Sequence, residues 1–210
     1  MKRCVIFCAA GFDGLLLPLE PEDLVVAADG GLAHVQQLGL QPHVILGDFD
    51  SLGYVPQDSR VYPVEKDDTD MMLAIRLGLS EECREFLLYG ALDGPRLDHT
   101  VANFQALSYL TEHGAFGWLI GKEHIVTCVK NGSLRFSREA KGILSVFCQG
   151  SQARGVTIRG LHYPLEQGTL SPHFPLGVSN HFIGETAQVR VEDGTLLVIW
   201  DRSNGLCERE

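Results

Sequence analysis

The stretch Gly47-Asp48-Phe49-Asp50-Ser51 places two carboxylates directly after a short apolar run at residues 43–46. A few consecutive apolar residues between a proline and a glycine are typical of a buried strand. Two acids just past a strand end suit a magnesium–phosphate site, because Mg²⁺ is usually held by one or two carboxylates together with phosphates and water. Asp50 or Ser51 could equally cap the following turn. The motif alone leaves both interpretations open.

On either side of this stretch, apolar runs alternate with segments of helical periodicity. Alternating strands and helices imply right-handed βαβ units and a mostly parallel sheet with helices on both faces. The first part of the chain is therefore predicted to be an α/β domain. Its expected strands are 4–9, 24–28, 43–46, 61–64, 85–89 and 116–120, and its expected helices are 32–38, 71–80 and 98–113.

Acidic residues recur after the carboxyl ends of these expected strands. In open parallel sheets the ligand crevice lies at those ends. A single Asp there is usually a helix cap, but four consecutive acid-bearing loops would gather carboxylates that repel one another, which indicates a bound cation. The acids are Asp29, then Asp48 and Asp50, then Asp67, Asp68 and Asp70, then Asp93 and Asp98.

The character of the chain changes after residue 121, where short segments rich in β-branched residues are separated by glycine-containing turns. This pattern predicts an all-β sandwich or jelly-roll domain, so the expected domains are 1–121 and 122–210. Residues 192–194 carry a hairpin signal, and residues 162–186 are expected to form a long functional loop. The expected strands are 124–129, 133–136, 143–148, 155–161, 187–191 and 195–200.

Composition narrows the function classes. The 210 residues carry a formal net charge of −10, and no Lys/Arg cluster exceeds two residues, so a nucleic-acid partner is not expected. The 6 cysteines show no CxxC pair or zinc-like spacing, which indicates reduced thiols. No segment reaches the roughly 18 apolar residues that span a bilayer. We therefore expect a soluble, cytoplasmic protein without a membrane partner.

The motifs together resemble the thiamine pyrophosphokinase family, in order and spacing along nearly the whole chain. The residues that carry the resemblance are Asp29-Gly30-Gly31, Gly47–Ser51, Lys66-Asp67-Asp68-Thr69-Asp70, Arg96-Leu97-Asp98-His99 with Asn103, and Ser179-Asn180. The resemblance implies Mg²⁺-dependent transfer of a pyrophosphoryl group from ATP to thiamine, giving thiamine diphosphate and AMP. It also implies an α/β domain followed by a β domain that binds thiamine and dimerises, in a homodimer whose sites are shared between subunits.

The resemblance assigns roles to the polar residues. Asp48, Asp50 and Asp70 are the expected metal ligands, and Asp29 and Asp98 complete the acidic rim. Lys66 and Arg96 are expected to neutralise phosphate oxygens, although an internal salt bridge to a surplus Asp remains the alternative for both. Asp67 either binds metal or helps to cap the helix at Thr69, and His99 is expected to be structural. The expected ATP-binding residues are Asp29, Gly30, Ser51, Lys66, Asp67, Thr69, Arg96 and Asn103.

For thiamine, Tyr163 matches the family position that presents an aromatic face to the substrate, and such a face attracts a cation. The alternative is a core tyrosine. Ser179 and Asn180 are expected to hydrogen-bond thiamine, or else to form a plain turn. The chain departs from the family pattern at Pro95, where Gly is usual, and at Met72, where a polar residue is common.

Two competing functions remain from the sequence. One is a pyrophosphokinase of another heterocyclic alcohol, such as a hydroxymethylpterin, which would share the acids and differ in the aromatic loop. The other is a non-catalytic sensor of nucleotides or divalent ions. Reaction products distinguish the first, and formation of AMP excludes the second.

Overall fold

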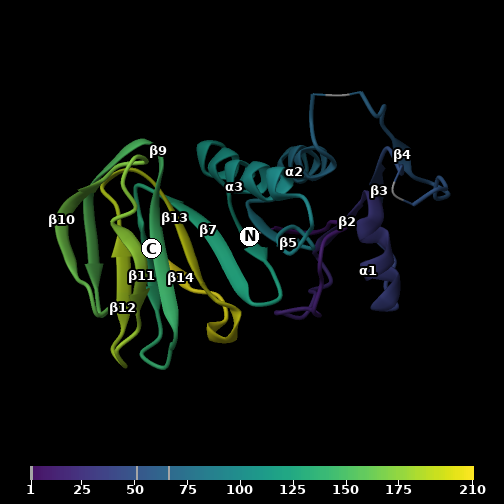
Figure 1. Cartoon of the computed structure of the whole chain (residues 1–210). Coiled ribbons are helices and arrows are strands. Elements are labelled where there is room, and N and C mark those ends of the chain that lie inside the picture. The colour runs from purple at the N-terminus through teal and green to yellow at the C-terminus, as the bar shows by residue number, and fades with distance from the viewer. Residues whose placement is uncertain (1, 51, 66) are drawn as a thin grey trace. The chain divides into compact units, whose positions relative to one another are not determined.

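The computed structural model describes residues 2–50, 52–65 and 67–210, and the chain divides into two compact units, Met1–Lys122 and Glu123–Glu210 (Figure 1). Within the described residues, no helix combines the length and the apolar character that a membrane span requires.

The first unit is an α/β fold around a parallel sheet, as predicted. The strands lie in the order β6-β5-β1-β2-β3-β4, and every neighbouring pair is parallel. Both β1 and β5 are buried almost end to end, which is typical of a sheet covered on both faces. The strands are β1 (Arg3–Phe7), β2 (Leu24–Ala28), β3 (Val44–Gly47), β4 (Arg60–Val61), β5 (Glu85–Tyr89) and β6 (Phe116–Ile120).

Three helices connect these strands: α1 (Leu32–Gln37), α2 (Asp70–Ser80) and α3 (Leu97–Glu112). Helix α1 carries the chain from β2 to β3, whereas α2 and α3 carry it in the opposite direction across the sheet. Right-handed connections therefore place α1 on one face and the α2–α3 pair on the other (Figure 1). The direction reverses between β1 and β5, and ligands of open α/β sheets bind at such a point.

A long connection without a described helix, residues 8–23, joins β1 to β2. A buried ion pair ties its end to the sheet: Arg3 Nη2 lies 2.6 Å from Asp23 Oδ2 and donates to it, and Arg3 Nε donates to Asp23 Oδ1 at 2.8 Å. Asp23 also accepts the backbone N–H of Glu20 at 2.8 Å. Only 7% of Arg3 and 3% of Asp23 is exposed. Water therefore hardly solvates the two charges, and each is stabilised mainly by the other.

The second unit is all-β, as predicted, and every strand pair in it is antiparallel. Its strand order is β14-β8-β12-β9-β13-β7, and β10 and β11 also pair with β9. Trp200 is 1% exposed in this unit and Trp118 is 4% exposed in the first, so both belong to the core. The strands are β7 (His124–Lys130), β8 (Ser133–Phe136), β9 (Ile143–Arg159), β10 (Leu165–Leu170), β11 (Gly177–His181), β12 (Ala187–Arg190), β13 (Asp193–Asp201) and β14 (Glu208–Arg209).

Three predictions for this unit were wrong. The expected strands 143–148 and 155–161 are one strand, β9, which continues through Gly150 and Gly155 because its neighbours keep pairing with it. The expected loop 162–186 contains β10 and β11, both paired with β9. The turn at 192–194 closes no hairpin, since β12 and β13 each pair with β9.

One prediction for the first unit also needs correction. The strand expected at 61–64 is only Arg60–Val61, which is exposed. It ends before Pro63, because proline has no backbone N–H to donate to a sheet ladder.

Asp23→Asn should lower the free energy of unfolding by about 3 kcal/mol, because removing one charge of a buried pair leaves the other uncompensated. Urea unfolding followed by circular dichroism measures the change. The matched control is Glu81→Gln, which removes an exposed pair with Lys2 and should cost under about 1 kcal/mol. Equal effects of the two substitutions would contradict the role given to the Arg3–Asp23 pair.

Candidate functional site

The acid-bearing loops of the first unit meet in a cleft of about 410 Å³ at the carboxyl ends of the strands. It lies at the reversal point between β1 and β5, since residues that follow both strands line it, together with the first residues of α2. Six of the residues predicted from the sequence line this cleft: Asp29, Asp50, Thr69, Asp70, Arg96 and Asn103.

Two glycines, one of which lines the cleft, allow backbone segments to approach closely. Gly90 directly follows β5 with φ of +64°, and a Cβ atom there would overlap the carbonyl oxygen of Cys8. A Cβ at Gly31 would likewise overlap the carbonyl oxygen of Phe7. Only glycine permits such close approach of two chains. Gly90 was not predicted to be a site residue, although a glycine directly after a predicted strand indicates a close backbone approach.

Among the described residues, three carboxylates lie close enough together to hold one metal ion. One oxygen from each of Asp29, Asp48 and Asp50 lies within 4.8 Å of the others. Asp48 Oδ1 also accepts the backbone N–H of Asp50 at 3.3 Å. Carboxylate oxygens are the donors that a hard cation such as Mg²⁺ prefers, and a cation would relieve their repulsion. The donor set therefore fits the predicted magnesium site.

The backbone around these acids is held in an uncommon conformation. Asp29 has φ of 48° and Phe49 has φ of 59°, in the left-handed region that costs a non-glycine residue energy. Phe49 is 2% exposed, so its buried ring anchors the loop between the two acids. Strain at this point is consistent with a functional loop, because the surrounding packing must hold it.

Asp70 lines the same cleft but lies outside the three-carboxylate group. Burial, and secondarily the charges of Asp70 and Asp29, raises the pKa of the Cys8 thiol to about 12. Cys8 is therefore protonated at neutral pH and is not a nucleophile. The third acid beside Asp48 and Asp50 is therefore Asp29, whereas Asp70 was predicted from the sequence. Asp70 lines the wall of the cleft and stays a candidate ligand.

The segment before α2 is partly described. Lys66 and Ser51, two of the predicted site residues, lie outside the described residues. Thr69 Oγ1 accepts the N–H of Met72 at 3.2 Å and so makes the helix cap itself. Asp68 pairs with Arg76 at 3.3 Å, and Asp67 is exposed away from the cleft lining.

Arg96 is bound to Asp98 by two hydrogen bonds, Nη2 to Oδ2 at 2.6 Å and Nε to Oδ1 at 3.2 Å. Both side chains are 64% exposed. The hydrogen-bonded pairing raises the pKa of Arg96 and lowers that of Asp98. This is the internal salt bridge that the sequence analysis kept as an alternative for Arg96.

Asn103 is 8% exposed and supports the cleft from α3. Its Nδ2 donates to the carbonyl oxygen of Ala91 at 2.6 Å, which fixes the turn that follows β5. His99 also lines the cleft, and Gly30 lies in the short 3₁₀ turn Asp29–Gly31 that leads into α1.

The predicted thiamine residues lie on the second unit. Tyr163 is 60% exposed, which excludes the core-tyrosine alternative. Asn180 is 3% exposed, and its side chain binds the backbone of Tyr163 at both ends: Oδ1 accepts the N–H at 2.9 Å and Nδ2 donates to the carbonyl at 2.7 Å. Ser179, exposed with φ of 59°, donates its N–H to Ser145 Oγ at 3.1 Å.

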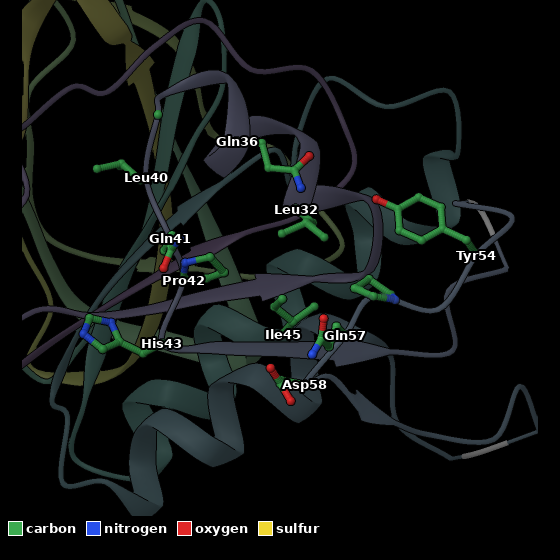
Figure 2. Close-up of a pocket in the computed structure, with 12 residues that line it drawn as sticks. Leu32, Gln36, Leu40, Gln41, Pro42, His43, Ile45, Tyr54, Gln57 and Asp58 are labelled. Atoms are coloured by element: carbon green, nitrogen blue, oxygen red, sulfur yellow. The ribbon is translucent and has the colours of Figure 1, made fainter.

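A larger groove of about 650 Å³ lies elsewhere on the first unit, between α1, β3 and the loop after β3. Figure 2 shows Leu32 and Gln36 projecting from α1, and Tyr54 from the loop, around this space. Asp58 supplies the one carboxylate among its described lining residues. The three grouped carboxylates lie elsewhere, at the smaller acidic cleft, so that cleft is the candidate functional site.

Two family models match the sequence. "Thiamin pyrophosphokinase, catalytic domain" matches residues 17–115, and "Thiamin pyrophosphokinase, vitamin B1 binding domain" matches residues 131–196. A curated relative, thiamine pyrophosphokinase of Bacillus subtilis (strain 168), is 26% identical over 187 residues, which cover 84% of this chain and 86% of the relative.

Solved structures share the fold. The crystal structure of thiamine pyrophosphokinase from Bacillus subtilis superimposes with a TM-score of 0.79 at 23% identity, covering 96% of this chain and 99% of that one. Thiamin pyrophosphokinase from Geobacillus thermodenitrificans gives 0.75 at 25% identity, covering 95% and 96%. The Candida albicans protein of the same name gives 0.72 at 17% identity, covering 94% and 88%.

Asp48→Asn should abolish most of the rise in Tm that Mg²⁺ produces, because it removes one of the three grouped carboxylates. Without metal, the variant should melt no lower than the original chain, since repulsion within the group is reduced. Thermal unfolding with and without Mg²⁺ measures both quantities. Asp58→Asn, in the groove of Figure 2, is the matched control and should leave the Mg²⁺ response intact. An undiminished response in Asp48→Asn would contradict the site.

Proposed function

The chain belongs to the thiamine pyrophosphokinase family and is a thiamine diphosphokinase by class. We propose that, with Mg²⁺, the protein transfers the pyrophosphoryl group of ATP to the hydroxyl of thiamine and gives thiamine diphosphate and AMP. The observation that carries the proposal is the group formed by Asp29, Asp48 and Asp50 at the ligand-binding edge of a parallel sheet.

The three grouped carboxylates would hold Mg²⁺, with Asp70 contributing from the cleft wall. A bound Mg²⁺ neutralises phosphate oxygens and stabilises charge that develops during transfer. A cation held by these acids would offset repulsion, because the chain's net charge of −10 opposes the approach of a polyanion.

Arg96 adds positive charge beside the metal site. Its pair with Asp98 is exposed, and exposed pairs contribute little to stability. The guanidinium can therefore leave Asp98 for a phosphate at small cost and bind it with two N–H groups. Lys66 is assigned the same neutralising role from its sequence position alone.

The hydroxyl oxygen of thiamine bonds to the β-phosphorus of ATP, and the bond from that phosphorus to the oxygen bridging it to the α-phosphorus breaks. AMP leaves with the bridging oxygen, and a carboxylate of the cleft accepts the hydroxyl proton. Positioning and charge stabilisation supply most of the acceleration in phosphoryl transfer.

Recognition of thiamine is proposed for the second unit. The exposed ring of Tyr163 offers an aromatic face to the thiazolium cation, a contact of about 0.5–2 kcal/mol. Ser179 and Asn180 would support this contact. We further propose a homodimer in which the acids of one subunit and Tyr163 of the other build each site, a hypothesis that rests on the family resemblance.

Incubation with ATP, thiamine and Mg²⁺ should yield AMP and thiamine diphosphate in equal amounts, and chromatography of the products measures both. ADP with thiamine monophosphate would show that the transferred group is misassigned. Use of a hydroxymethylpterin with no use of thiamine would favour the related pyrophosphokinase. Absence of AMP with every alcohol would favour the sensor.

Mixing Asp50→Asn chains with Tyr163→Ala chains, by unfolding and refolding them together, should restore activity to about a quarter of the original. Random pairing makes about half the dimers mixed, and each mixed dimer then has both lesions in one site and a native second site. Activity is assayed at limiting thiamine, where loss of the Tyr163 face matters most.

Each variant refolded alone supplies the baseline, and Asp50→Asn alone should lose about a hundredfold in turnover because charge stabilisation is removed. No gain above this baseline, with mixed dimers demonstrated by differently tagged chains, would show that each site is built within one subunit.

A further inference from the structure

Three aromatic side chains form one cluster on the second unit: His162, Tyr163 and His181. The two imidazoles are stacked, with ring centroids 4.5 Å apart and planes 17° from parallel. The Tyr163 ring stands edge-on to both, at 4.6 Å and 88° from His162 and at 5.9 Å and 85° from His181. Edge-to-face and stacked arrangements at these distances are favourable.

The backbone places these rings together. Leu161 and Phe182 form an antiparallel bridge, and the next residue inward on each side is a histidine. The His162 N–H donates to the His181 carbonyl at 3.0 Å, so the two histidines lie side by side. Asn180 completes the arrangement, because its Oδ1 accepts the N–H of His181 at 3.0 Å as well as that of Tyr163 at 2.9 Å.

An exposed tyrosine ordinarily samples several rotamers, and ordering it on binding costs entropy. Here the side chain of Tyr163 is exposed, yet its backbone is hydrogen-bonded by Asn180 and its ring lies nearly perpendicular to two neighbouring imidazoles. On another side, Tyr163 lines a cavity of about 120 Å³ whose walls include Leu165 and Leu176. The ring is therefore held in place before any ligand arrives.

We propose that His162 and His181 are positioning residues for thiamine, which act by bracing the ring of Tyr163, and that Asn180 acts through the Tyr163 backbone. This inference rests on the proposed function, because it takes Tyr163 as the thiamine contact. The imidazoles act only as flat aromatic rings, so a phenyl ring in the same place should also hold the ring of Tyr163 in position.

Steady-state kinetics of His181→Ala should show a KM for thiamine about three- to tenfold higher, with kcat and the KM for ATP changed less than about twofold, as expected for loss of an aromatic contact. His162→Ala should behave alike. His181→Phe should restore the KM for thiamine to within about twofold of the original and should keep the pH profile of the original chain. His173→Ala, on the exposed connection between β10 and β11, is the matched control and should change nothing.

An unchanged KM for thiamine in both alanine variants would overturn the inference and leave the proposed function standing. A loss in His181→Ala that Phe does not restore would also overturn it, since an imidazole N–H or charge would then be required. If the original chain forms no thiamine diphosphate, the proposed function itself fails, which this series detects at its first measurement. Should an alanine variant unfold, His181→Phe still decides: restored folding with a raised KM contradicts bracing.

Discussion

Repulsion among Asp29, Asp48 and Asp50 is the constraint around which the first unit is built. Three carboxylates within 4.8 Å would separate if their loops were free to move. The parallel pairing of β2 with β3 holds the loops side by side. Gly47 permits this approach, since a Cβ there would lie 3.1 Å from the Asp29 backbone. Strand pairing and the burial of Phe49 therefore hold three like charges close together against their mutual repulsion.

In the second unit, the side chain of Tyr163 is exposed and yet held in one position. Burial cannot do this for Tyr163, so hydrogen bonds from buried Asn180 and T-shaped contacts with His162 and His181 replace it. Each unit therefore holds its functional side chains in place before a ligand binds. Strained backbone holds the acids of the first unit, and side-chain contacts hold Tyr163 in the second. Preparation of this kind reduces the entropy lost on binding.

Much of the fold could be predicted because its signals are local. The strands at 24–28, 85–89 and 116–120 are found at the predicted residues, since apolar runs between turn residues leave few alternatives. By contrast, β10 and β11 escaped prediction because they are largely exposed and exist through pairing with β9. Polar residues around Gly150 resemble a turn in sequence, yet the ladder continues through them.

For the candidate site, sequence motifs identified the acids but not their grouping. The group of Asp29, Asp48 and Asp50 involves left-handed backbone at Asp29 and Phe49, which no local sequence pattern specifies. The pairing of Arg96 with Asp98 was foreseeable, as the residues are two positions apart. The contact between His162 and His181 was not, because nineteen positions separate them and backbone pairing beside the Leu161–Phe182 bridge brings them together.

The connection from β3 to β4 joins parallel strands without a described helix, although such crossovers usually contain one. Its first residues are anchored by Phe49, whereas Tyr54, Gln57 and Asp58 are exposed around the groove. Insertions in the exposed part would be inexpensive, since doubling a flexible loop costs only about 0.6 kcal/mol. Loop length can therefore vary at the exposed residues 57–58 at little cost, whereas an insertion between Asp48 and Asp50 would separate the two carboxylates.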